Sequence, residues 1–422
     1  MRSLLFPLDH RLTPELMTDR LSSFSTVLHA VDIWRKPAFD ARYRILAKAN
    51  IGTTEFPANA GSEALHKLKL PDAPCVTRLR REGCDIFGKT TMTELAGFVT
   101  TAKPNLGYSH LGGFPKNPHG DFPPGGSSSG SAVAVAAGLC DAALGTETRG
   151  SLMKPGLACG VVSYKPTRGL ISRTCIVPIS HHFDAPGVIA RSVADVATIA
   201  GLMMGEDPRD PATLTVDRVI RRVGRLESVG KRLRLAVLGG EDAAASLPQW
   251  LRDAADLIPV TRVEMDFSYK LITSLDIRND MDDLLGQYGG GETPSSFSEL
   301  YEYYRSHPET HPYGMDRLDD AMKMVMLPKD EIDRIADESI GRANQLIDGL
   351  LEKTQANAVV SATFVDWWSI SGAPSITVPI AKTVSGQPVV LMLGASFGKD
   401  DALIEVAKRI ETARNARAGM KS

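Results

Sequence analysis

The sequence predicts an α/β fold. Its 422 residues can bury a large core, in one domain or in two smaller ones. Short apolar segments typical of buried strands alternate with longer segments whose apolar residues recur at helical spacing. The run Gly130–Leu139 consists almost entirely of Ser, Ala, Val and Gly, which predicts a thin helix packed on every side.

The expected elements follow this pattern along the chain. A surface helix is expected at Glu15–Lys36, and a helix that starts near Asp72 and Pro74 should stop at Gly83. Ser192 and Asp195 have the spacing of a capping box before another helix. Further helices are expected at 247–257, 271–350 and 400–414, and strands at 44–50, 86–87, 142–144, 160–164, 234–238 and 260–265.

Composition and charge exclude several classes of protein. A formal net charge of −2 gives no reason to expect nucleic acid or an anionic membrane as a partner. Five cysteines, an odd number among apolar neighbours, predict reduced thiols and a cytoplasmic protein. No cysteine pairs with a histidine at metal-ligand spacing, so no metal site is expected. The apolar run Leu4–Phe6 stops at Pro7, too short for a signal peptide, and no segment is long enough to span a membrane.

The segment from Pro124 to Pro166 predicts the functional site. Two glycines and the serines Ser127, Ser128 and Ser129 open it, and a second serine loop follows at Ser151. Glycines allow close backbone approach, and serines can direct hydroxyl and N–H groups to one point. One helix and one strand would fix both loops in place.

Three known motifs match here, but their contexts argue against them. Gly126–Gly130 fits the nucleophile elbow G-x-S-x-G, yet the proline-rich segment before it cannot be the strand that the elbow requires. Ser151–Lys154 fits S-x-x-K, but no partner motif follows and Pro155 is unfavourable for the required helix. Gly83–Thr90 fits a phosphate-binding loop, although it should follow a helix and contain a buried strand.

The serine loops resemble those of the amidase signature family. Residues 125–131 read GGSSSGS and residues 145–151 read GTETRGS, and the family shows GGSSxGS followed by GTxxxGS. The resemblance, clear from about Ala47 to Met204, implies that Ser151 is the nucleophile and that Ser127, preceded by a cis peptide bond, bridges it to Lys48. It also implies an α/β fold in one large domain, with a central mixed, twisted β-sheet covered by helices on both faces.

The same resemblance implies one domain over 1–422. Residues 40–205 would form the catalytic core, 206–355 a variable, partly helical insertion or cap, and 356–422 the return to the central sheet. Segments 371–379, 388–393 and 400–414 resemble the family in that last part. Lys89, in a GKTxxxE segment, is expected to be structural.

The implied chemistry is hydrolysis of an amide. A neutral Lys48 would accept a proton from Ser127, which accepts one from Ser151 as Ser151 attacks the carbonyl carbon. Neutrality requires burial that lowers the pKa of the amine by several units. No metal or organic cofactor is needed. The oxyanion would be held by backbone N–H groups of Thr148, Arg149, Gly150 and Ser151.

The substrate is expected to be a small amide that bears a carboxylate or a similar acceptor. Arg149, Lys154 and Ser128 are the candidate contacts. Arg149 stands where the family usually has glycine, and Ala49 where it usually has aspartate, so an impaired binding homologue stays an alternative. Another is the glutaminase subunit of a tRNA-dependent amidotransferase, which would need partner chains and a longer helical tail. A homodimer is left open.

Overall fold

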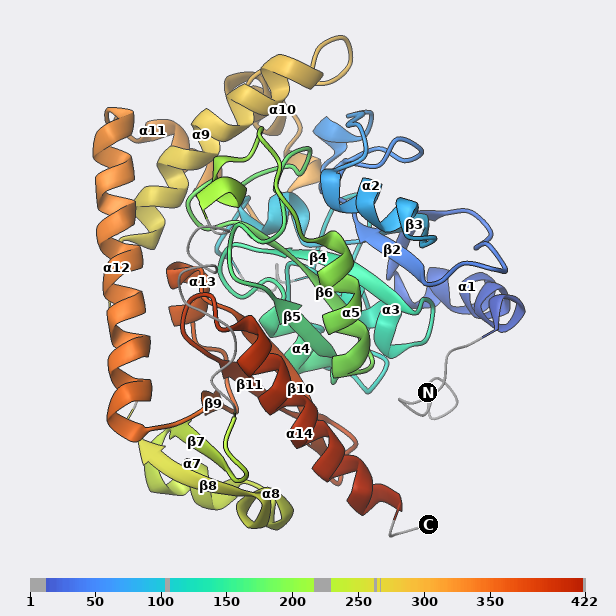
Figure 1. The fold of residues 1–422 in the computed structure, drawn as a ribbon. Helices are drawn as coiled ribbons and strands as arrows, with labels where there is room; N and C mark the ends of the chain where they lie inside the picture. Colours follow the sequence, from blue (N-terminus) through green and yellow to red (C-terminus); the bar gives the residue numbers. More distant parts are fainter. Residues whose placement is uncertain (1–12, 103–106, 216–228, 262–263, 266, 420–422) are drawn as a thin grey trace.

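A single mixed β-sheet organises the molecule (Figure 1). The computed structural model describes residues 13–102, 107–215, 229–261, 264–265 and 267–419, so the apolar run Leu4–Phe6 lies outside them. Within these residues eleven strands pair in the order β1 (Val31–Trp34), β3 (Asp85–Thr90), β2 (Arg44–Lys48), β4 (Ala142–Glu147), β6 (Ala185–Ala190), β5 (Val162–Lys165), β10 (Ser375–Lys382), β11 (Pro388–Gly394), β9 (Ala358–Ser361), β7 (Leu233–Leu238) and β8 (Ala255–Val260).

The sheet has two parallel parts with an antiparallel centre. Strands β3, β2 and β4 run parallel, as do β9, β7 and β8, and the other neighbours are antiparallel. The parallel strands β2 and β4 end in Lys48 and Glu147, so the segments that follow these two residues leave the sheet at the same edge. Strand β9 and the strands after it lie in the same sheet as β2, while the division into core, insertion and return stays a prediction.

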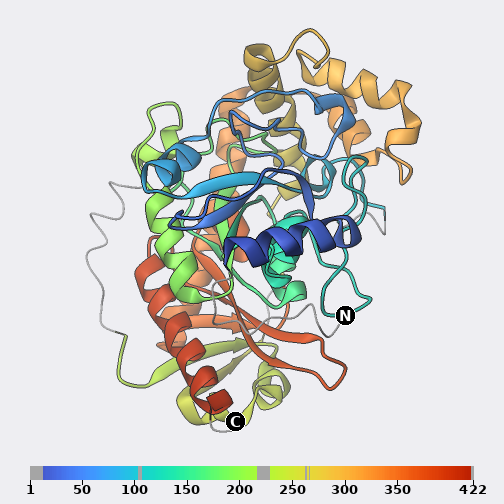
Figure 2. The ribbon, with the colours of Figure 1, turned by 90° about the vertical axis from the view of Figure 1, so that its right-hand side faces the viewer.

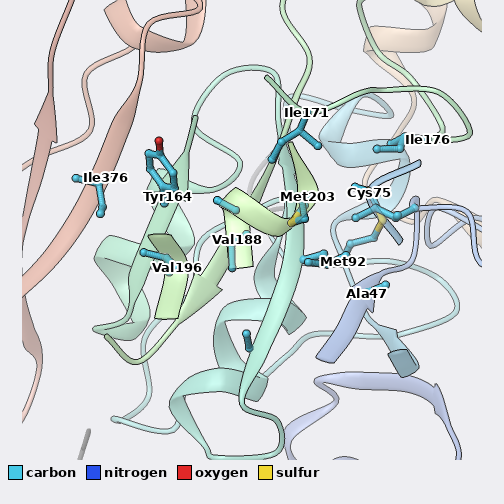
Figure 3. Close-up of a cluster of buried hydrophobic side chains, with 14 of the residues drawn as sticks. Ala47, Cys75, Met92, Tyr164, Ile171, Ile176, Val188, Val196, Met203 and Ile376 are labelled. Carbon is cyan, nitrogen blue, oxygen red and sulfur yellow. The ribbon is translucent and has the colours of Figure 1, made fainter. Parts of the chain in front are cut away.

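Helices cover both faces of the sheet, which confirms the predicted fold class (Figure 2). In β2, Ile45 and Ala47 pack into one buried core, part of which Figure 3 shows, and Leu46 packs into the other. This alternation is what a strand buried on both faces requires.

The first core is covered by α2 (Pro74–Arg81), α5 (Val193–Met203), α7 (Gly240–Ser246), α8 (Gln249–Ala254) and α14 (Asp400–Gly419). The second is covered by α1 (Pro14–Leu28), α3 (Ser129–Ala136), α4 (Met153–Cys159), α12 (Lys329–Thr354) and α13 (Trp367–Ser371).

A group of helices lies along the top and left side of the molecule in Figure 1. Helix α9 contacts α10, α11 and α12, and its buried side chains enter both cores. These cap helices are α9 (Tyr269–Tyr288), α10 (Phe297–Ser306), α11 (Asp316–Lys323) and α12, and short 3₁₀ turns occur at Glu63–Leu65, Glu94–Gly97 and Pro308–Thr310.

Several expected elements have different bounds. The helix predicted at Glu15–Lys36 ends at Leu28, because Val31–Trp34 pairs with β3 as the edge strand β1. Helical spacing continues through Trp34, but sheet pairing overrides it. The helix predicted at 247–257 ends at Ala254, and the strand expected at 260–265 lies earlier in the chain, as β8 (Ala255–Val260), which shares only Val260 with the expected range. Residues 262–263 lie outside the described residues.

Several local predictions are confirmed. Gly83 has φ +76° just after α2, and the Ser192 hydroxyl accepts a hydrogen bond from Asp195 N–H at the start of α5. The phosphate-loop pattern ends in the buried strand β3. Pro155 was expected to oppose a helix, yet it lies in the first turn of α4, where a helix needs no N–H donor. No helix in the described residues is long and apolar enough to cross a membrane.

A buried ion pair fastens β2 to the segment before β4. Arg44 donates to both oxygens of Asp141, with Nε–Oδ2 at 2.8 Å, and both side chains are at most 8% exposed. Asp141→Ala would leave Arg44 buried without its carboxylate, which typically costs about 3–5 kcal/mol. We expect a clearly lower urea midpoint by circular dichroism.

The matched control for this prediction is Arg334→Ala, which removes a pair that is 60% exposed on both sides. Its effect should be about 0.5 kcal/mol or less. Equal shifts for the two variants would contradict the structural role of Asp141.

Candidate active site

The serine loops and Lys48 meet at one edge of the sheet. Strands β2 and β4 are parallel, with Ala47 paired to Leu144, so Lys48 and the residues after Leu144 leave the sheet at the same edge. The first serine loop leads into α3, and the second leads from β4 into α4. The fold therefore brings together segments that are about a hundred residues apart.

Lys48 is fully buried at the end of β2. Its Nζ lies 2.8 Å from Ser127 Oγ, 2.8 Å from Thr146 Oγ1 and 3.3 Å from Thr146 O. Burial lowers the pKa of Lys48 to about 7, against the opposing charges of Asp184 and Glu147. Near neutral pH the amine therefore exists in charged and uncharged forms in similar amounts.

Ser127 lies in a tightly packed loop. The Gly126–Ser127 peptide bond is cis, as the resemblance implies, and Ser127 is 2% exposed. Its carbonyl accepts a hydrogen bond from Thr93 N–H at 3.0 Å. A Cβ at Gly130 would lie 2.4 Å from Thr91 O, so only glycine permits this approach of α3 to the segment after β3.

Ser151 lies in the second loop and is 8% exposed. Its carbonyl accepts the N–H of Ser128 at 3.1 Å, which ties the two serine loops together. The structure records no hydrogen bond between the hydroxyls of Ser151 and Ser127, both of which are described. The Glu147 carboxylate braces the loop, because its Oε2 accepts the N–H groups of Leu152 and Met153 at 2.8 and 3.0 Å.

The turn before Ser151 presents backbone donors. No acceptor in the described part of the chain receives the N–H groups of Arg149, Gly150 and Ser151. Gly150 has φ +87°, and a Cβ there would lie 2.6 Å from the Phe364 ring. The conformation and the packing both require glycine. Such N–H groups can stabilise a developing oxyanion.

The three candidate substrate contacts have different surroundings. Arg149 forms an ion pair with Asp366 at 2.7 Å and lies over the Tyr269 ring, so its charge is largely compensated. Lys154 lies over the Phe364 ring at 4.5 Å and has no ion-pair partner among the described residues. Burial, then the charge of Arg149, lowers the pKa of Lys154. Ser128 is fully buried and donates to Thr146 O, so it supports the loop from inside.

A cavity of about 430 Å³ adjoins this edge of the sheet. Thr146 and Thr148 contribute to its wall beside the serine loops, and most of the other lining residues come from the segment 173–181, from helix α9 and from residues 209–211. Asp184 is also in the wall and accepts the Thr148 hydroxyl at 2.5 Å. Burial raises the pKa of Asp184 to about 6. The cavity is large enough for a small organic molecule, but its lining includes neither Ser127 nor Ser151, and none of the three candidate substrate contacts.

Three residues of the site were missed in the sequence. Thr146 supplies the other acceptors of Lys48, Glu147 braces the loop that carries Ser151, and Asp184 orients Thr148. Glu147 had a usable signal, since an acid that ends a buried apolar strand needs partners. Its third partner, Ser369 Oγ at 2.7 Å, is far away in the sequence.

Comparison with known proteins finds similarity over the part of the chain that contains Lys48 and both serine loops. The family model described as Amidase matches residues 44–251. A glutamyl-tRNA(Gln) amidotransferase subunit of Salinibacter ruber is 42% identical over 175 residues, 41% of this chain, and the match spans only 33% of that relative's length. The corresponding protein of Methanothermobacter thermautotrophicus is 28% identical over 94% of this chain and 92% of its own.

Solved structures are similar over almost the whole chain. The native peptide amidase from Stenotrophomonas maltophilia aligns with a TM-score of 0.80 and 27% identity, covering 95% of this chain and 93% of that one. The similarity therefore extends from the serine loops to the complete fold.

The buried amine makes stability depend on pH. The pKa of Lys48 is about 7 in the folded protein, and the ordinary value of 10.5 applies when the chain unfolds. Between these values the unfolded chain binds a proton that the folded chain lacks, so Lys48 makes stability rise with pH by on the order of 1.4 kcal/mol per unit. Lys48→Met lacks this contribution. The unfolding free energy of the wild type minus that of the variant should therefore increase from about pH 7 to 9 in urea denaturation. A pH-independent difference would contradict a neutral Lys48.

Proposed function

Because residues 44–251 belong to the amidase family, we propose that this chain is an amidohydrolase that cleaves the C–N bond of a small amide through a serine acyl-enzyme. The observation that carries the proposal is the 2.8 Å contact of Lys48 Nζ with Ser127 Oγ, made by an amine whose pKa is about 7. A serine hydroxyl needs a base to become a nucleophile, and a buried neutral lysine can be that base.

The surroundings of Lys48 suit the neutral amine. Such an amine has two N–H donors and one lone pair. The two oxygens of Thr146 accept the donors, and the lone pair then points to Ser127 Oγ. Lys48 can therefore accept the Ser127 proton while its own hydrogens stay bonded. This arrangement favours Ser127 as the intermediate between the base and Ser151.

The proposed reaction has two stages. Ser151 Oγ bonds to the carbonyl carbon as its proton passes to Ser127 and the Ser127 proton passes to Lys48. The N–H groups of Thr148, Arg149, Gly150 and Ser151 stabilise the oxyanion. The C–N bond then breaks, and Lys48 returns a proton through Ser127 to the leaving amine. Water hydrolyses the acyl-enzyme by the same route, with Lys48 again as the base.

A second candidate function is the glutaminase of an amidotransferase. The extended similarity to the glutamyl-tRNA(Gln) amidotransferase protein of Methanothermobacter thermautotrophicus supports it. That function predicts that ammonia release from glutamine depends on partner chains, whereas a free-standing amidase acts alone on other amides. Assay of a panel of primary amides, ureas and anilides together with glutamine separates the two.

Covalent labelling tests the nucleophile without knowledge of the substrate. A fluorophosphonate probe should label the wild type and leave Ser151→Ala unlabelled, because the probe traps an activated serine. Activity of Ser151→Ala on any amide identified in the panel should fall roughly 10⁴-fold or more.

Ser129→Ala is the matched control for labelling. Ser129 belongs to the same serine run, but its buried hydroxyl has no hydrogen-bond partner among the residues that the structure describes. It should label at the wild-type rate. Absence of labelling in the wild type would favour a binding homologue, and labelling of Ser151→Ala would remove Ser151 from the mechanism.

The rate of labelling should also report the base. Since neutral Lys48 is the active form, the labelling rate should rise with pH through about 7. At pH 5 about one Lys48 in a hundred is neutral, so the rate should be about a hundredfold below its plateau. Rates measured by gel fluorescence from pH 5 to 9 give the profile. A flat profile, or an unchanged profile in Lys48→Met, would refute the role of Lys48.

Lys154 supports selection of a carboxylate-bearing amide, because its ammonium has no ion-pair partner in the described residues. A charge-assisted hydrogen bond is typically worth about 1.5–3 kcal/mol. The wild type should therefore have a kcat/KM about 10–100-fold higher for a half-amide carboxylate than for the matching diamide. Lys154→Met should lose this preference and Lys382→Met, which changes an exposed lysine, should keep it. Equal kcat/KM values for the two amides would end the hypothesis.

A further inference from the structure

Two adjacent histidines meet three aspartates from the cap helices beside the cavity. His181 and His182 lie in the segment between β5 and β6, with their ring centroids 4.0 Å apart. Asp276 and Asp280 are one turn apart on α9, and Asp333 comes from α12. One ligand atom each of His181, His182 and Asp276 lie within 4.8 Å of one another.

We propose that His181, His182 and Asp276 bind a divalent transition-metal ion of the Zn²⁺ type, with Asp280 beside His181 as the candidate fourth ligand. Imidazole nitrogen combined with carboxylate oxygen is a donor set that suits zinc. Zinc takes four such ligands in a tetrahedron with bonds of about 2.0–2.2 Å, which separates the ligand atoms by roughly 3.3–3.5 Å.

On the side that faces α9, the distances between the potential ligand atoms approach those of a tetrahedral zinc site. His182 Nδ1 lies 3.2 Å from Asp276 Oδ1, and His181 Nδ1 lies 2.9 Å from Asp280 Oδ1 and 3.8 Å from Asp276 Oδ1. The Nδ1 atom of each ring therefore faces the carboxylates of α9. Three potential ligand atoms, from His181, His182 and Asp276, lie within 4.8 Å of one another, and Asp280 reaches the same group through His181.

The second oxygen of each carboxylate is already fixed by the loop. Asp276 Oδ2 accepts the Ser180 hydroxyl, and Asp280 Oδ2 accepts the His181 backbone N–H at 2.7 Å. Asp280 Oδ1 faces the His181 imidazole, and both oxygens of Asp276 face the His182 imidazole, with Nδ1 3.2 Å from Oδ1 and 3.0 Å from Oδ2. Carboxylates oriented in this way are typical supports of metal ligands.

Asp333 occupies the position of an outer-sphere carboxylate. Its Oδ1 lies 3.2 Å from His182 Nε2 and 3.9 Å from His181 Nε2. Histidines that bind a metal through one ring nitrogen usually donate the other N–H to a carboxylate. Such a hydrogen bond fixes the tautomer that keeps the Nδ1 lone pair free for the ion.

Charge also favours a metal ion here. Asp276 is fully buried, and a buried carboxylate needs positive charge nearby. Two protonated imidazoles could supply it, but they would place like charges about 4 Å apart. A divalent ion with two neutral imidazoles supplies the same charge without that repulsion.

The proposed ion would join the cap to the catalytic loops. It would fasten α9, and α12 through Asp333, to the segment that continues to Asp184. His181 and Asp280 also line the cavity, so the ion would form part of its wall. Its role is structural, and it is independent of the proposed serine chemistry.

The test uses the full chain after treatment with a chelator. Calorimetric titration with Zn²⁺ should show saturable binding of one ion, and Co²⁺ should give the visible absorption of a tetrahedral site. His182→Gln and Asp276→Asn should lower the affinity by more than about 100-fold, and Asp333→Asn by about 10–100-fold. Zn²⁺ should raise the Tm of the wild type and not that of His182→Gln.

The control is His66→Gln, which removes a histidine outside the cluster and should leave the affinity unchanged. Circular dichroism verifies that each variant folds. Asp333 is 44% exposed, so Asp333→Asn tests the site even if Asp276→Asn does not fold. Absence of saturable binding in the wild type would overturn the proposal, and so would wild-type affinity in both His182→Gln and Asp333→Asn.

Discussion

The burial of one amine at the end of a strand is the constraint on which the site depends. Lys48 is enclosed by the sheet, by α3 and by the serine loops, and water is excluded from it. Burial removes the preference for the ammonium, while Thr146 and Ser127 satisfy the hydrogen-bonding groups of the amine. A more open loop would hydrate Lys48 and restore its charge. The close packing of glycine and serine around it therefore has a chemical reason.

The charges of two nearby carboxylates limit how far burial lowers the pKa of Lys48. Glu147 and Asp184 both favour the ammonium, yet neither forms an ion pair with Lys48. Hydrogen bonds hold each carboxylate instead. Glu147 accepts them from the backbone at the start of α4 and from Ser369. Asp184 accepts them from Thr148 and from the backbone of the segment that precedes Asp184. The acids therefore shape the loops without pairing with the amine. Ala49, which carries no carboxylate, is consistent with this balance.

The sequence predicts what is local and misses what tertiary contacts decide. The α/β class, the start of α5 and the buried strand β3 follow from periodicity, capping and apolar runs. Lys48 and the two serines were chosen from a motif, and the fold brings Lys48 to Ser127. Strand β1 was predicted as helix because its pairing with β3 has no local signal. The partner of Arg149 was equally hidden, since Asp366 lies 217 residues further along the chain.

These distant contacts affect how the protein is made. The turn that carries Ser151 is braced by Ser369 through Glu147 and by Asp366 through Arg149, each more than two hundred residues later in the chain. Synthesis proceeds from the N-terminus, and a domain generally folds as a unit. The nascent chain therefore contains the serine loops long before their supports exist. The contacts that brace the Ser151 turn can therefore form only after the segment with Asp366 and Ser369 has been synthesised.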